Sequence, residues 1–80
     1  MEFTDAQAEI LVNCWLLASE GKGQVVEEWA LPDAERLSAA GWLERRTVDV
    51  TGDTCWFWTR EAELALDMTA LRRKYPADLN

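Results

Sequence analysis

The side chains that could carry out catalysis are few in this 80-residue chain, and their spacing fits no catalytic motif. The sequence has no histidine, the commonest proton shuttle near neutral pH. Its two cysteines, Cys14 and Cys55, have neither the CxxC spacing of zinc sites nor the histidine partner of cysteine nucleophiles. Gly21-Lys22-Gly23 is too short for a phosphate-binding loop. We therefore expect a protein that is not an enzyme and that uses neither a cofactor nor a metal.

The two cysteines also bear on the compartment in which the protein works. Two are too few for a disulfide framework, so we expect both thiols to be reduced and mostly buried; a disulfide or a reactive thiol is the alternative. Residues 1–4 lack the basic and apolar regions of a signal peptide. No apolar run approaches the roughly 20 residues that a membrane span needs. These features favour a cytoplasmic protein.

The sequence offers more candidate residues for binding than for catalysis. Trp56 and Trp58 alternate along a predicted β-hairpin over residues 42–60. Gly52-Asp53 is typical of a two-residue hairpin turn. The core face of that hairpin would contain Val48, Val50, Cys55 and Phe57, and its exposed face Thr47, Asp49, Trp56 and Trp58. Indole rings among charged residues are typical of an interface centre with a polar rim. The alternatives are burial of both rings within the domain and a homodimer formed through the hairpin.

Acidic side chains gather in the N-terminal part of the sequence. Residues 1–35 hold eight acidic residues and one basic residue, whereas residues 36–80 hold seven of each, so the first segment accounts for the net charge of −7. Such a field repels phosphate backbones and favours basic partners; a solubilising surface is the alternative. The acidic residues that we expect to face a basic partner protein are Glu2, Asp5, Glu9, Glu27 and Glu28.

Capping signals and apolar spacing predict the helices that position these residues. Thr4 and Gln7 form a capping box at the start of a helix that ends near Glu20, before Gly21 and Gly23. Residues 24–31 fit either a short helix or a strand that begins at Val25-Val26. Pro32 suits the first position of a second helix over 32–40, with Ala34 and Leu37 on its inner face.

A last helix is predicted over residues 60–75, with Thr59 as its N-cap. Its apolar stripe comprises Leu64, Met68, Leu71 and Tyr75. Trp15 and Trp42 are expected to lie in the core, whereas Trp29 fits the core and the surface equally well. Arg72-Arg73-Lys74 suits the negative end of the helix dipole, with phosphate binding as the alternative.

This order of elements predicts one α+β domain over residues 1–80, with three or four helices and a two-stranded antiparallel hairpin in a winged-helix-like arrangement. Residues 37–46, LSAAGWLERR, resemble the segment that leads from the recognition helix into the wing of MarR-like winged-helix regulators. Residues 58–62 are similar to the segment after the wing, and the whole resemblance covers residues 33–66. It implies DNA binding, with phosphates held by Arg36, Arg45, Arg46 and Arg60 and by the auxiliary residues Arg72, Arg73 and Lys74.

The charge pattern favours a different function. The stretch that matches the recognition helix, residues 33–40, carries one basic and two acidic residues. In size, acidity and lack of catalytic motifs, the chain resembles small phage-encoded inhibitors, namely anti-CRISPR proteins and acidic DNA mimics. That resemblance implies a non-catalytic protein that engages a basic surface of a partner and inhibits a nucleic-acid-binding machine. A winged-helix transcriptional regulator is the alternative.

Overall fold

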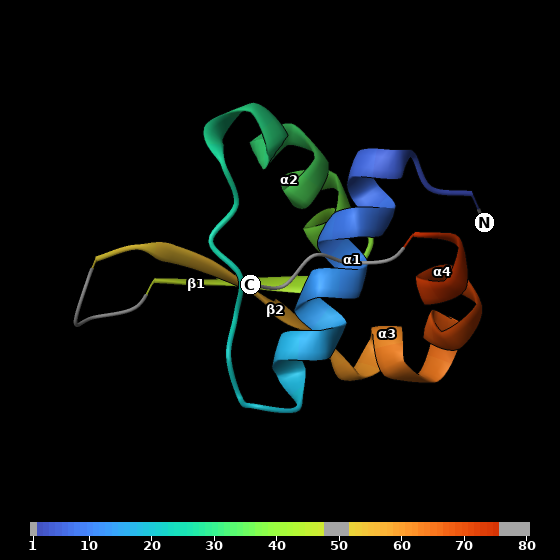
Figure 1. Cartoon of the computed structure of the whole chain (residues 1–80). Coiled ribbons are helices and arrows are strands. Elements are labelled where there is room, and N and C mark those ends of the chain that lie inside the picture. The colour runs from blue at the N-terminus through green and yellow to red at the C-terminus, as the bar shows by residue number, and fades with distance from the viewer. Residues whose placement is uncertain (1, 48–51, 76–80) are drawn as a thin grey trace.

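The computed structural model describes residues 2–47 and 52–75. The elements in order are α1 (Asp5–Ala18), the 3-10 helix η1 (Glu28–Ala30), α2 (Leu31–Ala39), β1 (Leu43–Thr47), β2 (Thr54–Trp58), α3 (Arg60–Ala65) and α4 (Met68–Lys74). β1 and β2 form a two-stranded antiparallel sheet that projects from the helices (Figure 1). The predicted α+β class is confirmed. Within the described ranges, no helix is long and apolar enough to span a membrane.

The capping box at the start of α1 is confirmed. The Thr4 hydroxyl accepts a hydrogen bond from the Gln7 backbone N–H at 3.2 Å, and the Gln7 side chain accepts one from the Thr4 N–H at the same distance. The helix ends at Ala18, and Gly21 then takes a left-handed conformation with φ of 70°. α1 lies at the centre of the molecule and packs against α2, α4 and β2 (Figure 1).

The segment between α1 and α2 combines features of both predicted alternatives. Gln24 forms an antiparallel bridge with Trp56, in which the two residues exchange backbone hydrogen bonds of 2.9 and 2.8 Å. The chain then forms the single turn of η1 before α2 begins at Leu31, one residue before the predicted start. Ala34 and Leu37 are buried, as predicted for the inner face of α2.

The register of the hairpin differs from the prediction. Leu43 pairs with Trp58, Arg45 with Trp56 and Thr47 with Thr54, so the predicted two-residue turn at Gly52-Asp53 is wrong. Because the shift is an even number of positions, Trp56 and Trp58 still share a face with Arg45 and Thr47. The predicted partners Val48, Asp49 and Val50 lie outside the described residues.

The predicted helix over residues 60–75 is broken in two. Thr59 caps α3 as predicted, by accepting a hydrogen bond from the Ala62 N–H, but α3 ends at Ala65. The side chain of Asp67 then caps α4 by accepting from the Ala70 N–H at 3.2 Å. The break separates the two halves of the predicted stripe, so Leu64 is 77% exposed whereas Met68 is 4% exposed.

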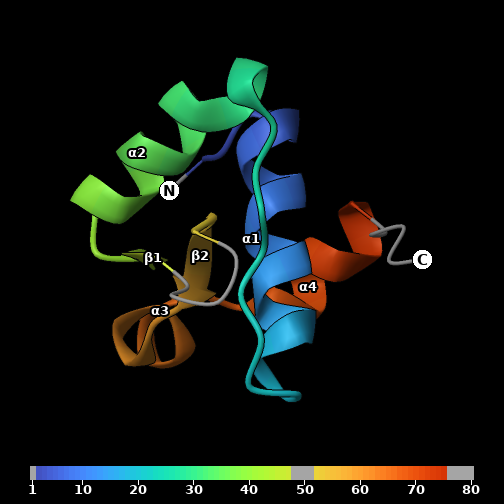
Figure 2. The same ribbon diagram turned by 90° about the vertical axis from the view of Figure 1, so that its left-hand side faces the viewer.

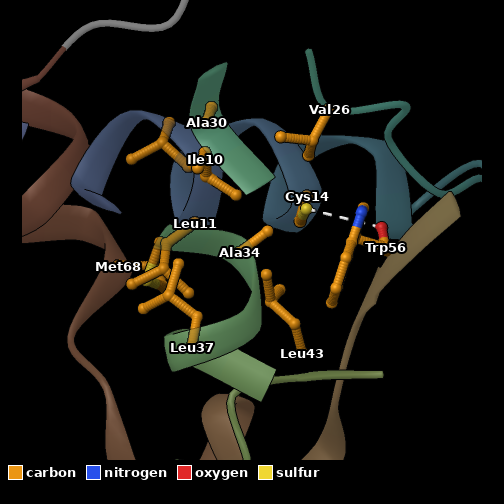
Figure 3. Close-up of a cluster of buried hydrophobic side chains, with 11 residues drawn as sticks. Ile10, Leu11, Cys14, Val26, Ala30, Ala34, Leu37, Leu43, Trp56 and Met68 are labelled. Atoms are coloured by element: carbon orange, nitrogen blue, oxygen red, sulfur yellow. Dashed lines mark hydrogen bonds between the residues drawn. The ribbon is translucent and has the colours of Figure 1, made fainter. Parts of the chain in front are cut away.

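The core forms where α1, α2, α4 and the base of the hairpin meet. Figure 3 shows Leu11, Leu37 and Met68 together at one end and Trp56 beside Cys14 at the other. The Cys14 thiol donates to the Trp56 carbonyl oxygen at 3.5 Å. Both cysteines are free and buried, as predicted, and burial raises the pKa of Cys14 to about 12. Trp15 and Trp42 are half-buried and pack against this core.

Candidate protein-binding surface

The tryptophans of the hairpin do not form an exposed aromatic pair. Trp56 is only 2% exposed, so the prediction that it lies on an exposed face is wrong. Its face of the sheet, shared with Leu43, packs toward α1, and the Gln24 bridge covers the open edge of β2. Trp58 is half-buried and packs against the core, and its indole N–H donates to a Glu63 carboxylate oxygen at 2.9 Å.

An exposed apolar surface lies instead on the segment between α1 and α2. Trp29 is 70% exposed and Val25 is 61% exposed, whereas Val26 and Ala30 are turned into the core. The alternation at Val25 and Val26 follows from the extended backbone beside the Gln24 bridge. The sequence left the position of Trp29 open, and the structure places it on the surface.

A hollow lies between this segment and α1, which run alongside each other in Figure 2. Its volume is about 180 Å³. We call it the α1–η1 hollow; α1 contributes Ala6, Glu9, Ile10 and Asn13, and the segment contributes Gln24, Val25, Val26, Glu27, Trp29 and Ala30. Asn13 is 8% exposed, and its side-chain oxygen is buried without a hydrogen-bond partner. The hollow thus combines exposed apolar groups, carboxylates and an unsatisfied acceptor.

The hollow brings together some of the acidic residues predicted to contact a partner. Glu9 and Glu27 line it, and the neighbouring Glu28 is exposed on η1. The Trp29 indole N–H donates to a Glu27 carboxylate oxygen at 2.5 Å, which ties the aromatic ring to an acidic group. Glu2 and Asp5 are exposed near the start of α1 but do not line the hollow.

The four arginines predicted for DNA binding lie on α2, on β1 and at the start of α3. All four are exposed, but Arg46 forms an ion pair with Glu44 at 2.8 Å and lies over the Phe57 ring. The hydrogen bond and the charge of Arg46 lower the pKa of Glu44. Arg36 and Arg60 form no ion pair within the described residues.

A second, larger groove lies between α2, β1 and α3, with a volume of about 650 Å³. Of the four arginines, only Arg45 lines it, together with the acidic residues Glu35, Glu44 and Glu61. Acidic groups therefore outnumber basic ones in this groove, which opposes phosphate binding there. We call it the α2–α3 groove.

Potential metal ligands and reactive thiols are the groups that could add chemistry to these two surfaces. Among residues 2–47 and 52–75, no group of three or more histidine, cysteine, aspartate or glutamate side chains could hold a metal ion. Burial raises the pKa of the Cys14 thiol from 9.0 to about 12, so this cysteine forms even less thiolate than an ordinary one. Comparisons with protein-family models, with curated proteins and with solved structures found no significant match.

Proposed function

We propose that this chain is a small acidic, non-catalytic, cytoplasmic protein that engages a basic surface of a partner protein. The observation that carries the proposal is the α1–η1 hollow, where exposed Trp29 and Val25 lie beside Glu9, Glu27 and Glu28. Aromatic anchors with a charged rim are typical of the centres of protein interfaces. In this proposal Trp29 takes the anchor role that was predicted from the sequence for Trp56 and Trp58.

The charges around the hollow support attraction to a basic partner. Of the residues that the structure describes, Glu9 and Glu28 form no ion pair with a basic side chain, and Glu27 interacts with the neutral indole of Trp29. Their carboxylates are therefore free to attract cationic groups and to accelerate encounter with a basic protein. The net charge of −7 extends the same attraction over a longer range.

The partner that this surface suits best is a nucleic-acid-binding machine. Proteins that bind nucleic acid carry basic surfaces that neutralise phosphates, and an acidic protein of this size could occupy such a surface. We therefore propose an inhibitory role of the anti-CRISPR or DNA-mimic type. A competition assay tests it: a panel of purified nucleases and CRISPR effector complexes is incubated with labelled DNA and increasing amounts of the protein. The proposal predicts displacement of DNA from at least one of them.

A winged-helix transcriptional regulator is the second candidate. It is favoured by the order of the elements and by the bridge between Gln24 and Trp56, which adds a third extended segment beside the hairpin. The acidic lining of the α2–α3 groove and the pairing of Arg46 with Glu44 count against phosphate contacts.

Titration with a random-sequence DNA duplex at low salt separates the two candidates. Counterion release makes nonspecific binding by a DNA-binding protein strongest under that condition. A protein-binding function predicts no measurable complex. Micromolar affinity with a steep salt dependence would overturn it in favour of the regulator.

A further inference from the structure

We propose that the α1–η1 hollow binds an arginine side chain of the partner protein. This inference rests on the proposed function and specifies the group that the acidic surface recognises. It draws on three features of the hollow: an exposed indole ring, two carboxylates from different elements, and a buried amide oxygen without a donor.

Trp29 provides a ring on which a cation can stack. Its side chain is 70% exposed, so much of the ring remains available to a partner. The hydrogen bond from its indole N–H to Glu27 keeps a carboxylate beside the ring. A guanidinium that stacks on the indole would therefore meet both the negative face of the ring and a carboxylate.

Asn13 and Glu9 line the α1 side of the hollow, and the Asn13 side chain carries a buried acceptor without a partner. Asn13 is 8% exposed and its Oδ1 accepts no hydrogen bond, which is costly for a buried polar atom. Glu9 lies one helical turn before Asn13 on α1, so the two side chains are on the same side of the helix. A donor-rich group in the hollow would meet the Glu9 carboxylate directly, and a rotation of the Asn13 side chain would bring its Oδ1 to the same group.

The size and chemistry of the hollow favour arginine over other occupants. A volume of about 180 Å³ is smaller than the roughly 300–1,000 Å³ typical of small-molecule pockets, and it suits a single side chain. Arginine offers five N–H donors in a planar group that can stack and bind carboxylates at the same time, whereas lysine offers a compact ammonium. Arginine therefore matches the combination of ring, carboxylates and amide oxygen.

Nuclear magnetic resonance of the full chain tests the inference with three peptides of the form Gly-Ser-X-Ser-Gly. X is arginine, lysine or citrulline, and citrulline has nearly the same shape as arginine but no charge. We expect the arginine peptide to shift the indole N–H signal of Trp29 and the side-chain amide signals of Asn13, with weaker shifts for lysine and none for citrulline. Equal shifts with citrulline, or shifts confined to the α2–α3 groove, would overturn the assignment.

Variants of the full chain then test which groups hold the arginine peptide. Trp29→Ala should weaken its binding about fivefold, which is the size expected for one exposed cation–π contact. Glu9→Gln should weaken it as well, whereas Glu35→Gln, which removes a carboxylate from the α2–α3 groove, should leave it unchanged. All three positions are exposed, so folding should be preserved, and circular dichroism checks this. Equal weakening by Glu9→Gln and Glu35→Gln would show nonspecific attraction and overturn the site.

Two further arms separate this inference from the proposed function. Free L-arginine should bind more weakly than the peptide; tighter binding would show a site for the amino acid and overturn the partner side chain as occupant. If a basic partner protein still binds through Glu27 and Glu28 while the arginine peptide does not bind, only the arginine assignment fails. If neither binds, the proposed function fails as well.

Discussion

Trp56 links three parts of the structure through its side chain and its backbone. The ring is among the largest fully buried side chains, and the backbone exchanges two hydrogen bonds with Gln24. Its carbonyl oxygen also accepts from the Cys14 thiol. We expect Trp56→Ala to lower the free energy of unfolding by about 3–5 kcal/mol, because it removes a large buried ring and leaves a cavity. Urea unfolding followed by circular dichroism measures this loss.

Trp29→Ala is the matched control for that substitution. The same change of side chain at a position that is 70% exposed should alter the free energy of unfolding by no more than about 0.5 kcal/mol. Similar losses for the two variants would contradict the assignment of Trp56 to the core and Trp29 to the surface.

The buried thiol of Cys14 should make the free energy of unfolding depend on pH in the alkaline range. Burial raises its pKa from 9.0 to about 12. Between these pH values the unfolded chain loses the thiol proton whereas the folded protein keeps it. Its contribution to stability is therefore complete below pH 9 and is lost as the pH rises toward 12. The free energy of unfolding should fall more steeply over this range in the wild type than in Cys14→Ala. Parallel pH profiles for the two proteins would contradict this.

The roles of individual tryptophans could be predicted only in part from the sequence. Strand alternation correctly placed Trp56 and Trp58 on one face, but alternation does not say which face is covered. The covering comes from Gln24 and α1, which are distant in sequence. Trp29 was ambiguous because the segment before Pro32 has no regular periodicity, so the aromatic anchor of the candidate site could not be predicted.

The break between α3 and α4 is the main feature at the scale of elements. Asp67 caps α4, and the non-helical backbone at Leu66-Asp67 separates the exposed Leu64 from the buried Met68. Met68→Ala should therefore lower the free energy of unfolding by about 2–5 kcal/mol. Leu64→Ala should change it by no more than about 0.5 kcal/mol, and thermal unfolding compares the two. Equal losses would indicate the continuous helix in which both residues face the core.

Local signals predicted the starts of elements well. The caps at Thr4 and Thr59 depend on a side chain and a backbone group three residues apart, so the sequence contains all the information needed. The hairpin register depends on long-range packing of Leu43 and Trp56, which outweighed the turn propensity of Gly52-Asp53. The cap at Asp67 was missed, because the regular apolar spacing from Leu64 to Tyr75 predicted an unbroken helix.

At the scale of the whole molecule, two concave surfaces carry acidic side chains but differ in their other lining residues. The α1–η1 hollow combines acidic groups with exposed apolar side chains, whereas the α2–α3 groove is acidic but contains Arg45 and lacks an exposed aromatic ring. The two surfaces share no lining residue. They therefore offer matched positions at which the same change of charge can be made, which separates a specific interface from general attraction to an acidic protein.

The proposed function requires that a basic partner protein binds at the α1–η1 hollow. Its most direct test is quantitative capture from a bacterial extract by immobilised wild-type protein, Glu27→Lys with Glu28→Lys, and Glu35→Lys with Glu61→Lys. The two double variants change the net charge equally. We predict that the wild type and the Glu35/Glu61 variant retain the same basic nucleic-acid-binding protein and that the Glu27/Glu28 variant loses it. Equal retention by all three proteins, or loss by both variants alike, would contradict the account.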